Sequence, residues 1–127
     1  KYLRPMKKTV NINANKKDIF YHYLNVTTVL HKLSPKEKHL LSLFLFYADR
    51  EKHNFKKQED LWNKVFSHEI KEQIMMDMDI KSSSIHNLMT SLRKKRVIQD
   101  NKIAAQYIVN LDDGKLELSF IFHERNL

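Results

Sequence analysis

The sequence has no cysteine, and its only glycine is Gly114. The first absence excludes disulfide scaffolds, thiolate nucleophiles and cysteine-ligated zinc or iron–sulfur centres. The second excludes glycine-rich phosphate loops, dinucleotide fingerprints and nucleophile elbows, because each of these needs more than one glycine. The single glycine therefore excludes the common nucleotide-driven enzymes. Long apolar runs are absent too: the longest, from Leu40 to Ala48, contains Ser42 and falls short of the ~20 residues of a membrane-spanning helix.

What the sequence has in excess is positive charge. Its 127 residues include 23 Lys and Arg against 15 Asp and Glu, which leaves a net charge of +8. Hydrophobic residues make up 42%, which is enough for one core, so a disordered chain is not expected. The charge surplus favours a polyanionic partner, nucleic acid before an anionic membrane surface. The alternative is a basic soluble protein with no specialised partner.

The positive charge is concentrated in two segments. Residues 1–17 contain no acid and are predicted to form a basic N-terminal arm ahead of a domain over residues 18–127. The second segment runs from Arg93 to Arg96, and Lys81 and Lys102 flank it. Because the acids gather elsewhere, we expect one basic face and one nearly neutral face. The cations of the arm are Lys1, Arg4, Lys7, Lys8, Lys16 and Lys17.

Apolar periodicity predicts helices through the N-terminal half. A first helix is expected from Asp18, as its cap, to Leu33. Ser34-Pro35-Lys36-Glu37 is a capping-box sequence with proline at the first helical position, and the nearly all-apolar stretch after it predicts a central, buried helix. A break with a short strand is expected at His53-Asn54-Phe55. Another helix starts near Glu59, and Ser67 either interrupts it or lies within it.

The C-terminal part predicts one amphipathic helix followed by a β-hairpin. Serines 82–84 offer an N-cap, and the helix ends in the basic residues 93–96, where the helix dipole favours cations. Residues 103–111 and 116–122 alternate apolar and polar positions on either side of the turn Asp112-Asp113-Gly114, which predicts two long antiparallel strands. The helical stripe expected to face the core is Ile85, Leu88, Met89 and Leu92.

The stretch from Ile80 to Ile98 resembles the recognition-helix signature of winged helix-turn-helix DNA-binding proteins. That signature has a small polar cap, a branched residue, two leucine-like positions, a basic pair, a glycine and a branched pair. With the capping box and the long apolar helix, the resemblance covers roughly residues 34–122. It implies a mostly α-helical fold with a small β-hairpin wing, as in bacterial, plasmid and phage regulators and replication initiators.

The sequence departs from this signature at Arg96, which stands where the family has glycine. A left-handed residue is the usual end of such a helix, and an arginine in that conformation costs ~1 kcal/mol. We therefore expect the helix either to end differently or to bend there without a left-handed residue.

The resemblance implies duplex-DNA binding through a recognition helix at about residues 83–96. Base edges would be read from its N-terminal part, where Asn87 can pair with adenine. Cations at its end and flanks would contact phosphates, and the basic arm would follow a groove or the backbone. The alternative is an ordinary solvated helix face whose cations complement the dipole. The implied DNA-binding residues are Lys81, Ser83, Ser84, His86, Asn87, Thr90, Arg93, Lys94, Arg96, Lys102, Arg4, Lys7 and Lys8.

One feature of the expected wing speaks against DNA binding. Its tip carries Asp112 and Asp113, which would repel phosphate, so the hairpin is expected to stay out of a groove and to be free for protein contacts. No catalytic, metal or cofactor site is predicted. The seven histidines show no i, i+4 pair with a third ligand nearby.

Two functional hypotheses follow. The first is a non-enzymatic transcriptional regulator or replication accessory that binds double-stranded DNA in the cytoplasm of a bacterial or phage-infected cell. It would form a homodimer through the N-terminal helix, which carries Phe20, Tyr21, Tyr23 and Leu24. The second is a phage virion or assembly protein that uses a winged-helix fold to contact other structural subunits. A membrane partner is not expected under either hypothesis.

Lysine outnumbers arginine 18 to 5, and Asn and Ile occur 10 times each, a bias that an AT-rich phage or bacterial genome would produce.

Overall fold

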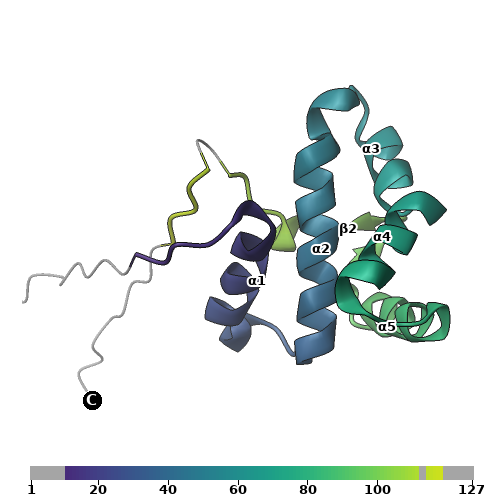
Figure 1. The fold of residues 1–127 in the computed structure, drawn as a ribbon, viewed down its shortest axis with the longest axis horizontal. Helices are drawn as coiled ribbons and strands as arrows, with labels where there is room; N and C mark the ends of the chain where they lie inside the picture. The colour runs from purple at the N-terminus through teal and green to yellow at the C-terminus, as the bar shows by residue number, and fades with distance from the viewer. Residues whose placement is uncertain (1–10, 112–113, 119–127) are drawn as a thin grey trace, which may run out of the picture.

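The computed structural model describes residues 11–111 and 114–118, and this part of the chain is mostly helical with one small antiparallel sheet (Figure 1). The helices are α1 (Lys16–Val26), α2 (Pro35–Glu51), α3 (Gln58–Val65), α4 (His68–Met78) and α5 (Ser82–Lys94). The strands are β1 (Ile98–Gln99) and β2 (Lys102–Ile103), and the 3₁₀ turns are η1 (Thr28–Leu30), η2 (Lys52–Asn54) and η3 (Ala105–Tyr107). The predicted class, mostly α-helical with a small hairpin, is confirmed at this level.

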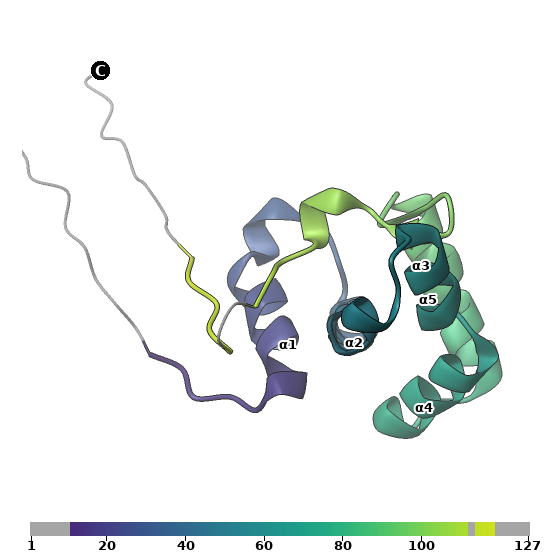
Figure 2. The same cartoon turned by 90° about the horizontal axis from the view of Figure 1, so that it is seen from above.

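Helix α2 is the centre of the fold. Figure 1 and Figure 2 show α1 on one side of it and α3, α4 and α5 on the other. Leu40, Leu41 and Phe44 of α2 are fully buried. At its N-terminus the Ser34 hydroxyl accepts from the Glu37 amide at 3.2 Å, and the Glu37 carboxylate accepts from the Ser34 amide at 2.7 Å. The capping box and the central buried helix are both confirmed.

Helices α3 and α4 are separated by a break at Phe66 and Ser67. The Ser67 hydroxyl accepts from the Ile70 amide at 3.4 Å and caps α4, so Ser67 starts a new helix. Phe66 remains in the core, with its ring edge-on to that of Phe44 at a centroid distance of 5.0 Å. The strand expected at His53–Phe55 is wrong, because Lys52–Asn54 form the 3₁₀ turn η2 that follows α2.

The first helix has other bounds than expected. Its cap is Asn15, whose side chain accepts from the Asp18 amide at 3.0 Å, so Asp18 lies inside α1. The helix ends at Val26 and not at Leu33, since η1 follows it. The last two residues of the segment that was predicted to be an arm are therefore helical. Lys16 and Lys17 belong to α1 and form ion pairs with Asp49 at 3.5 Å and Asp77 at 2.7 Å.

The hairpin lies earlier in the chain than the alternating pattern predicted. Strands β1 and β2 pair Ile98 with Ile103 and Gln99 with Lys102. The turn between them is Asp100-Asn101, whose φ values of 52° and 56° are both left-handed, as a two-residue turn with matching strand twist requires. Asp and Asn tolerate this conformation better than other non-glycine residues.

The long strand expected over residues 103–111 is wrong. Only its first position belongs to β2, and the Tyr107 amide donates to the Ala104 carbonyl at 3.0 Å within the 3₁₀ turn η3. The two ends of this stretch still contribute to the core, because Ile103 and Leu111 are buried. Of the expected return strand at 116–122, residues 119–122 lie outside the described part of the chain, as do Asp112 and Asp113.

Helix α5 begins and ends differently from the prediction. It starts at Ser82, and its N-cap is Lys81 with no side-chain hydrogen bond, so the three serines are not the cap. At its end Arg96 has a φ of 61°. The Val97 amide donates to the Leu92 carbonyl at 2.9 Å and the Arg96 amide to the Arg93 carbonyl at 3.0 Å, which is the Schellman pattern. Arg96 thus adopts the left-handed conformation of the family's glycine, and both expected alternatives are wrong.

Replacing Arg96 with glycine is expected to raise the free energy of unfolding by about 0.5–1 kcal/mol. The left-handed conformation penalises a residue with a Cβ by ~1–2 kcal/mol, and the greater freedom of glycine in the unfolded chain offsets part of this gain. Urea denaturation followed by circular dichroism measures the change. Arg93→Gly, inside the last helical turn, is the matched control and should be destabilising by about 1 kcal/mol. Equal destabilisation of both variants would contradict the strain argument.

Candidate nucleic-acid interface

Helix α5 presents a polar face to solvent and an apolar face to the core. Ile85, Met89 and Leu92 are buried and Leu88 is half-buried, which confirms the predicted stripe. The opposite side exposes residues that were predicted to read base edges or contact phosphates. Ser84 and Thr90 are half-buried, and the Thr90 hydroxyl donates to the His86 carbonyl of its own helix at 3.0 Å. The predicted residues of α5 that are exposed are Ser83, His86, Asn87, Arg93 and Lys94.

Positive charge is unbalanced on α5 and the hairpin and nearly balanced elsewhere. Residues 80–102 contain six cations and one acid, whereas residues 11–79 contain eleven cations and ten acids. Ion pairs of the described residues tie up Lys16, Lys17, Arg50, Lys52 and Lys64, all on the first three helices or the turn after α2. Five predicted phosphate contacts are exposed and lie within ion-pair distance of no described carboxylate: Lys81, Arg93, Lys94, Arg96 and Lys102.

Lys95 is the exception in the basic cluster, because its ammonium group points back into the fold. It contacts the Glu37 carboxylate at 2.6 Å and donates to the Lys32 carbonyl at 2.8 Å. The Ser91 hydroxyl donates to the other oxygen of Glu37 at 2.5 Å. Glu37 is only 3% exposed, so this group connects the N-terminus of α2 to the C-terminal end of α5.

The charge on Glu37 is strongly stabilised in the folded protein. Burial raises the pKa of the carboxyl group, but the hydrogen bonds from Lys95, from the Ser34 amide and from Ser91 outweigh that effect and bring the pKa to about 2. Sequence analysis identified Glu37 only as part of a capping box. No local pattern could assign its other partners, because they lie 54 and 58 positions further along the chain.

The hairpin is held against both α5 and α3. The Gln99 side chain donates to the Arg96 carbonyl at 2.7 Å, and the Asn101 side chain donates to the Asn63 side chain of α3 at 2.8 Å. Lys102, on the second strand, lines a pocket together with Gln58, Glu59 and Trp62 of α3. The acidic turn predicted at Asp112-Asp113 lies outside the described residues, and so do the three predicted contacts of the arm, Arg4, Lys7 and Lys8.

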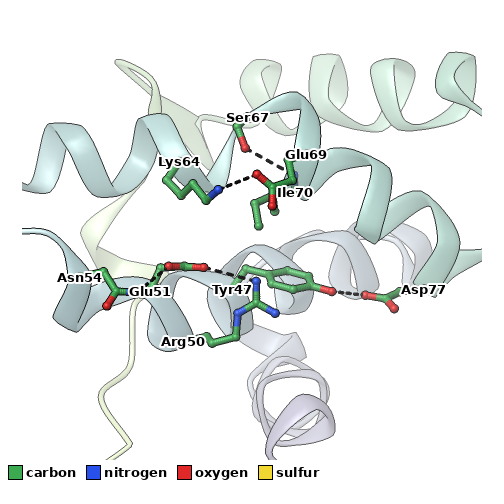
Figure 3. Close-up of polar contacts among 9 residues, drawn as sticks. All are labelled: Tyr47, Arg50, Glu51, Asn54, Lys64, Ser67, Glu69, Ile70 and Asp77. Carbon is green, nitrogen blue, oxygen red and sulfur yellow. Dashed lines mark hydrogen bonds and ion pairs between the residues drawn. The ribbon is translucent and has the colours of Figure 1, made fainter.

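Polar groups that line a cleft at α1, α2 and α4 are paired with each other. A cleft of about 420 Å³ between α1, α2 and α4 is lined by Lys17, Tyr21, His39 and Asp77 among others. Asp77 pairs with Lys17 and also accepts from the Tyr47 hydroxyl at 2.5 Å (Figure 3). Burial, followed by this hydrogen bond, raises the pKa of Tyr47 above its usual range. Within residues 11–111 and 114–118, no group of three His, Asp or Glu side chains is placed to hold a metal ion.

The expected dimer surface is mostly used inside the chain. Phe20 and Leu24 are each 1% exposed in the core, and the Tyr21 ring lies edge-on to His39. Because Phe20 and Leu24 are buried, they are not available to a second copy, and the expectation that they form a dimer surface is wrong. The exposed aliphatic residues of the region are Val26 at the end of α1, which is 45% exposed, and Val29 and Leu30 of η1, which are 87% and 75% exposed.

No family model matches this chain, and neither does any curated protein or solved structure. None of the described helices is long and apolar enough to cross a membrane. Function has to be inferred from the basic face of α5 and the hairpin.

Proposed function

We propose that this chain is a non-enzymatic winged helix-turn-helix protein that binds duplex DNA. In this proposal α4 and α5 form the helix-turn-helix, α5 is the recognition helix and β1–β2 is a short wing. The observation that carries it is the set of five exposed cations on α5 and the hairpin that have no described carboxylate partner. Unpaired cations on one helix and on the hairpin after it suit a polyanion better than they suit a solvated, self-neutralised surface.

The recognition helix would lie in the major groove, which is wide enough to admit one α-helix. Ser83, His86 and Asn87 lie in its N-terminal half and are exposed, so they would face base edges, with the Asn87 amide suited to adenine. Arg93 and Lys94 would contact phosphates and set the register. Ser84 and Thr90 contribute less than the sequence indicated, since both are half-buried and the Thr90 hydroxyl is already bonded.

The hairpin would contact the backbone without entering a groove. Its strands have two residues each, and Asp100 at the turn adds a negative charge beside Lys102. Such a short ribbon can bring Arg96 and Lys102 to a phosphate but cannot reach across a groove. Regulation of transcription and assistance in replication are both served by binding of this kind.

The second candidate is a structural role through protein contacts, as in a phage virion or its assembly. The observation that favours it is the exposure of Val29 and Leu30, two adjacent aliphatic side chains that a contact with another protein would bury. This role predicts weak DNA binding with little dependence on sequence or on the charge of α5.

Binding of the protein to a labelled random duplex, followed by fluorescence anisotropy across salt concentrations, tests the proposal. Five phosphate contacts predict that log K falls with log salt at a slope of about −4 to −5. Lys94→Glu is expected to weaken binding about tenfold or more and to make the slope shallower by about 1 to 2. Lys115→Glu makes the same change in net charge on the exposed 114–118 segment, which lies on the α1 side of α2, away from α5 (Figure 2).

The two variants separate a specific face from a general charge effect. If Lys94→Glu and Lys115→Glu weaken binding equally, α5 is not the contact surface and the proposal is wrong. Weak wild-type binding with a flat salt dependence would favour the structural role.

A further inference from the structure

A second group of unpaired cations lies beside the end of α5. Lys32 and Lys36 are exposed, and no described carboxylate lies within ion-pair distance of either. They belong to the linker between η1 and α2 and to the first turn of α2. The linker enters α2 at the end of that helix that lies next to α5 (Figure 1). The hydrogen bond from Lys95 to the Lys32 carbonyl places the linker against the C-terminal end of α5.

No exposed acid close in the sequence weakens the positive potential of this linker. The sequence contains no Asp or Glu between Asp18 and Glu37. Glu37 itself is buried, and its charge is neutralised by Lys95. Lys32 and Lys36 therefore extend the positive charge of Arg93 and Lys94 from α5 onto the linker and the first turn of α2.

The linker is also held in a defined position relative to α5. The Glu37 carboxylate accepts hydrogen bonds from the Ser34 amide in the linker and from Ser91 and Lys95 at the end of α5. One buried group thus connects three segments. A ligand that engages α5 would meet Lys32 and Lys36 at fixed places, so binding would need little further ordering of the backbone.

We propose that Lys32 and Lys36 form a second phosphate-contacting group, which extends the DNA-binding surface from α5 onto the linker. This inference rests on the proposed function. Lys95, although it lies in the basic cluster, is a positioning residue that holds the linker and makes no phosphate contact. Lysine suits this role, since a point charge can contact phosphate without the planar geometry that a bidentate arginine needs.

The salt dependence of duplex binding measures the number of phosphates contacted. Lys32→Gln/Lys36→Gln is expected to weaken binding roughly tenfold or more and to make the salt slope shallower by about 2, because each phosphate contact contributes ~0.9 to the slope. Lys115→Gln removes one charge from an exposed lysine outside the proposed contact surface, likewise unpaired within the described residues, and it should leave both quantities nearly unchanged. Thermal unfolding confirms that each variant is folded at the temperature of the assay.

Proximity to DNA can be tested without any measure of affinity, because the chain has no cysteine of its own. Lys36→Cys labelled with an iron–EDTA reagent should cut the duplex strands near the linker, and Lys115→Cys labelled in the same way should not. If the wild type binds and Lys94→Glu weakens binding, but the linker variants leave the slope unchanged and no cuts appear, this inference is wrong and the proposed function stands. If the wild type shows no salt-dependent binding, both are wrong.

Discussion

Replacing Glu37 with alanine is expected to lower the free energy of unfolding by about 3 kcal/mol. The carboxylate is 3% exposed and accepts from the Ser34 amide, Ser91 and Lys95. Its removal loses half of the capping box, leaves the half-buried Ser91 hydroxyl without its acceptor, and leaves Lys95 with only the Lys32 carbonyl. Urea denaturation measures the loss, and Glu117→Ala, at an exposed position with no described partner, is the matched control. A loss below about 1 kcal/mol would contradict the importance of this contact.

The same carboxylate predicts how stability depends on pH. Its pKa is lowered from 4.5 to about 2 in the folded protein, so its contribution is fully present above about pH 4.5 and is lost as the pH falls toward 2. In Glu37→Gln the free energy of unfolding should therefore fall less steeply over that range than in the wild type. Denaturation series at several pH values between 2 and 6 measure the difference, and parallel curves for the two proteins would rule out a low pKa for Glu37.

Replacing Phe44 with alanine is expected to cost about 3–5 kcal/mol, the largest loss for a single change in α2. The ring is fully buried at the centre of the molecule, where it lies edge-on to the Phe66 ring. Truncation removes apolar area and leaves a cavity that surrounding helices on both sides of α2 cannot close. Phe46 offers a matched control two positions further along the same helix, since its ring is only half-buried.

The two phenylalanine variants test whether α2 is the common core element. Phe46→Ala is expected to cost about 1–2 kcal/mol, because part of its ring already faces water. The change in the urea midpoint reports both values, and the slope of the transition should stay constant. If Phe44→Ala costs no more than Phe46→Ala, the core is not centred on α2 as described.

Local patterns in the sequence predicted those features that depend on neighbouring residues. Ser34 and Glu37 lie one helical turn apart, so their reciprocal hydrogen bonds follow from helix geometry alone. The buried stripe of α5 follows from the i, i+3, i+4 spacing in the same way. The exposed cations on α5 were predicted as well, because residues on the helix face opposite a buried stripe lie in solvent.

Features that depend on distant segments could not be predicted. Lys95 was counted in the basic segment with its neighbours, although it pairs with Glu37. Lys32 and Lys36 were not singled out, since only the packing of the linker against α5 brings them near the basic cluster. The alternation over residues 103–111 predicted a strand, but the backbone closes into η3 after a much shorter hairpin.

The sequence by itself determined most of the helical segments, the buried stripe of α5 and where the surplus of positive charge lies. These properties follow from spacing along the chain and from composition. Only the tertiary structure decided which cations are free and which are paired, where the hairpin turns, and that Arg96 is held in a left-handed conformation. Each of these depends on contacts between residues far apart in the sequence, and such contacts form only when α2, α5 and the linker have packed together.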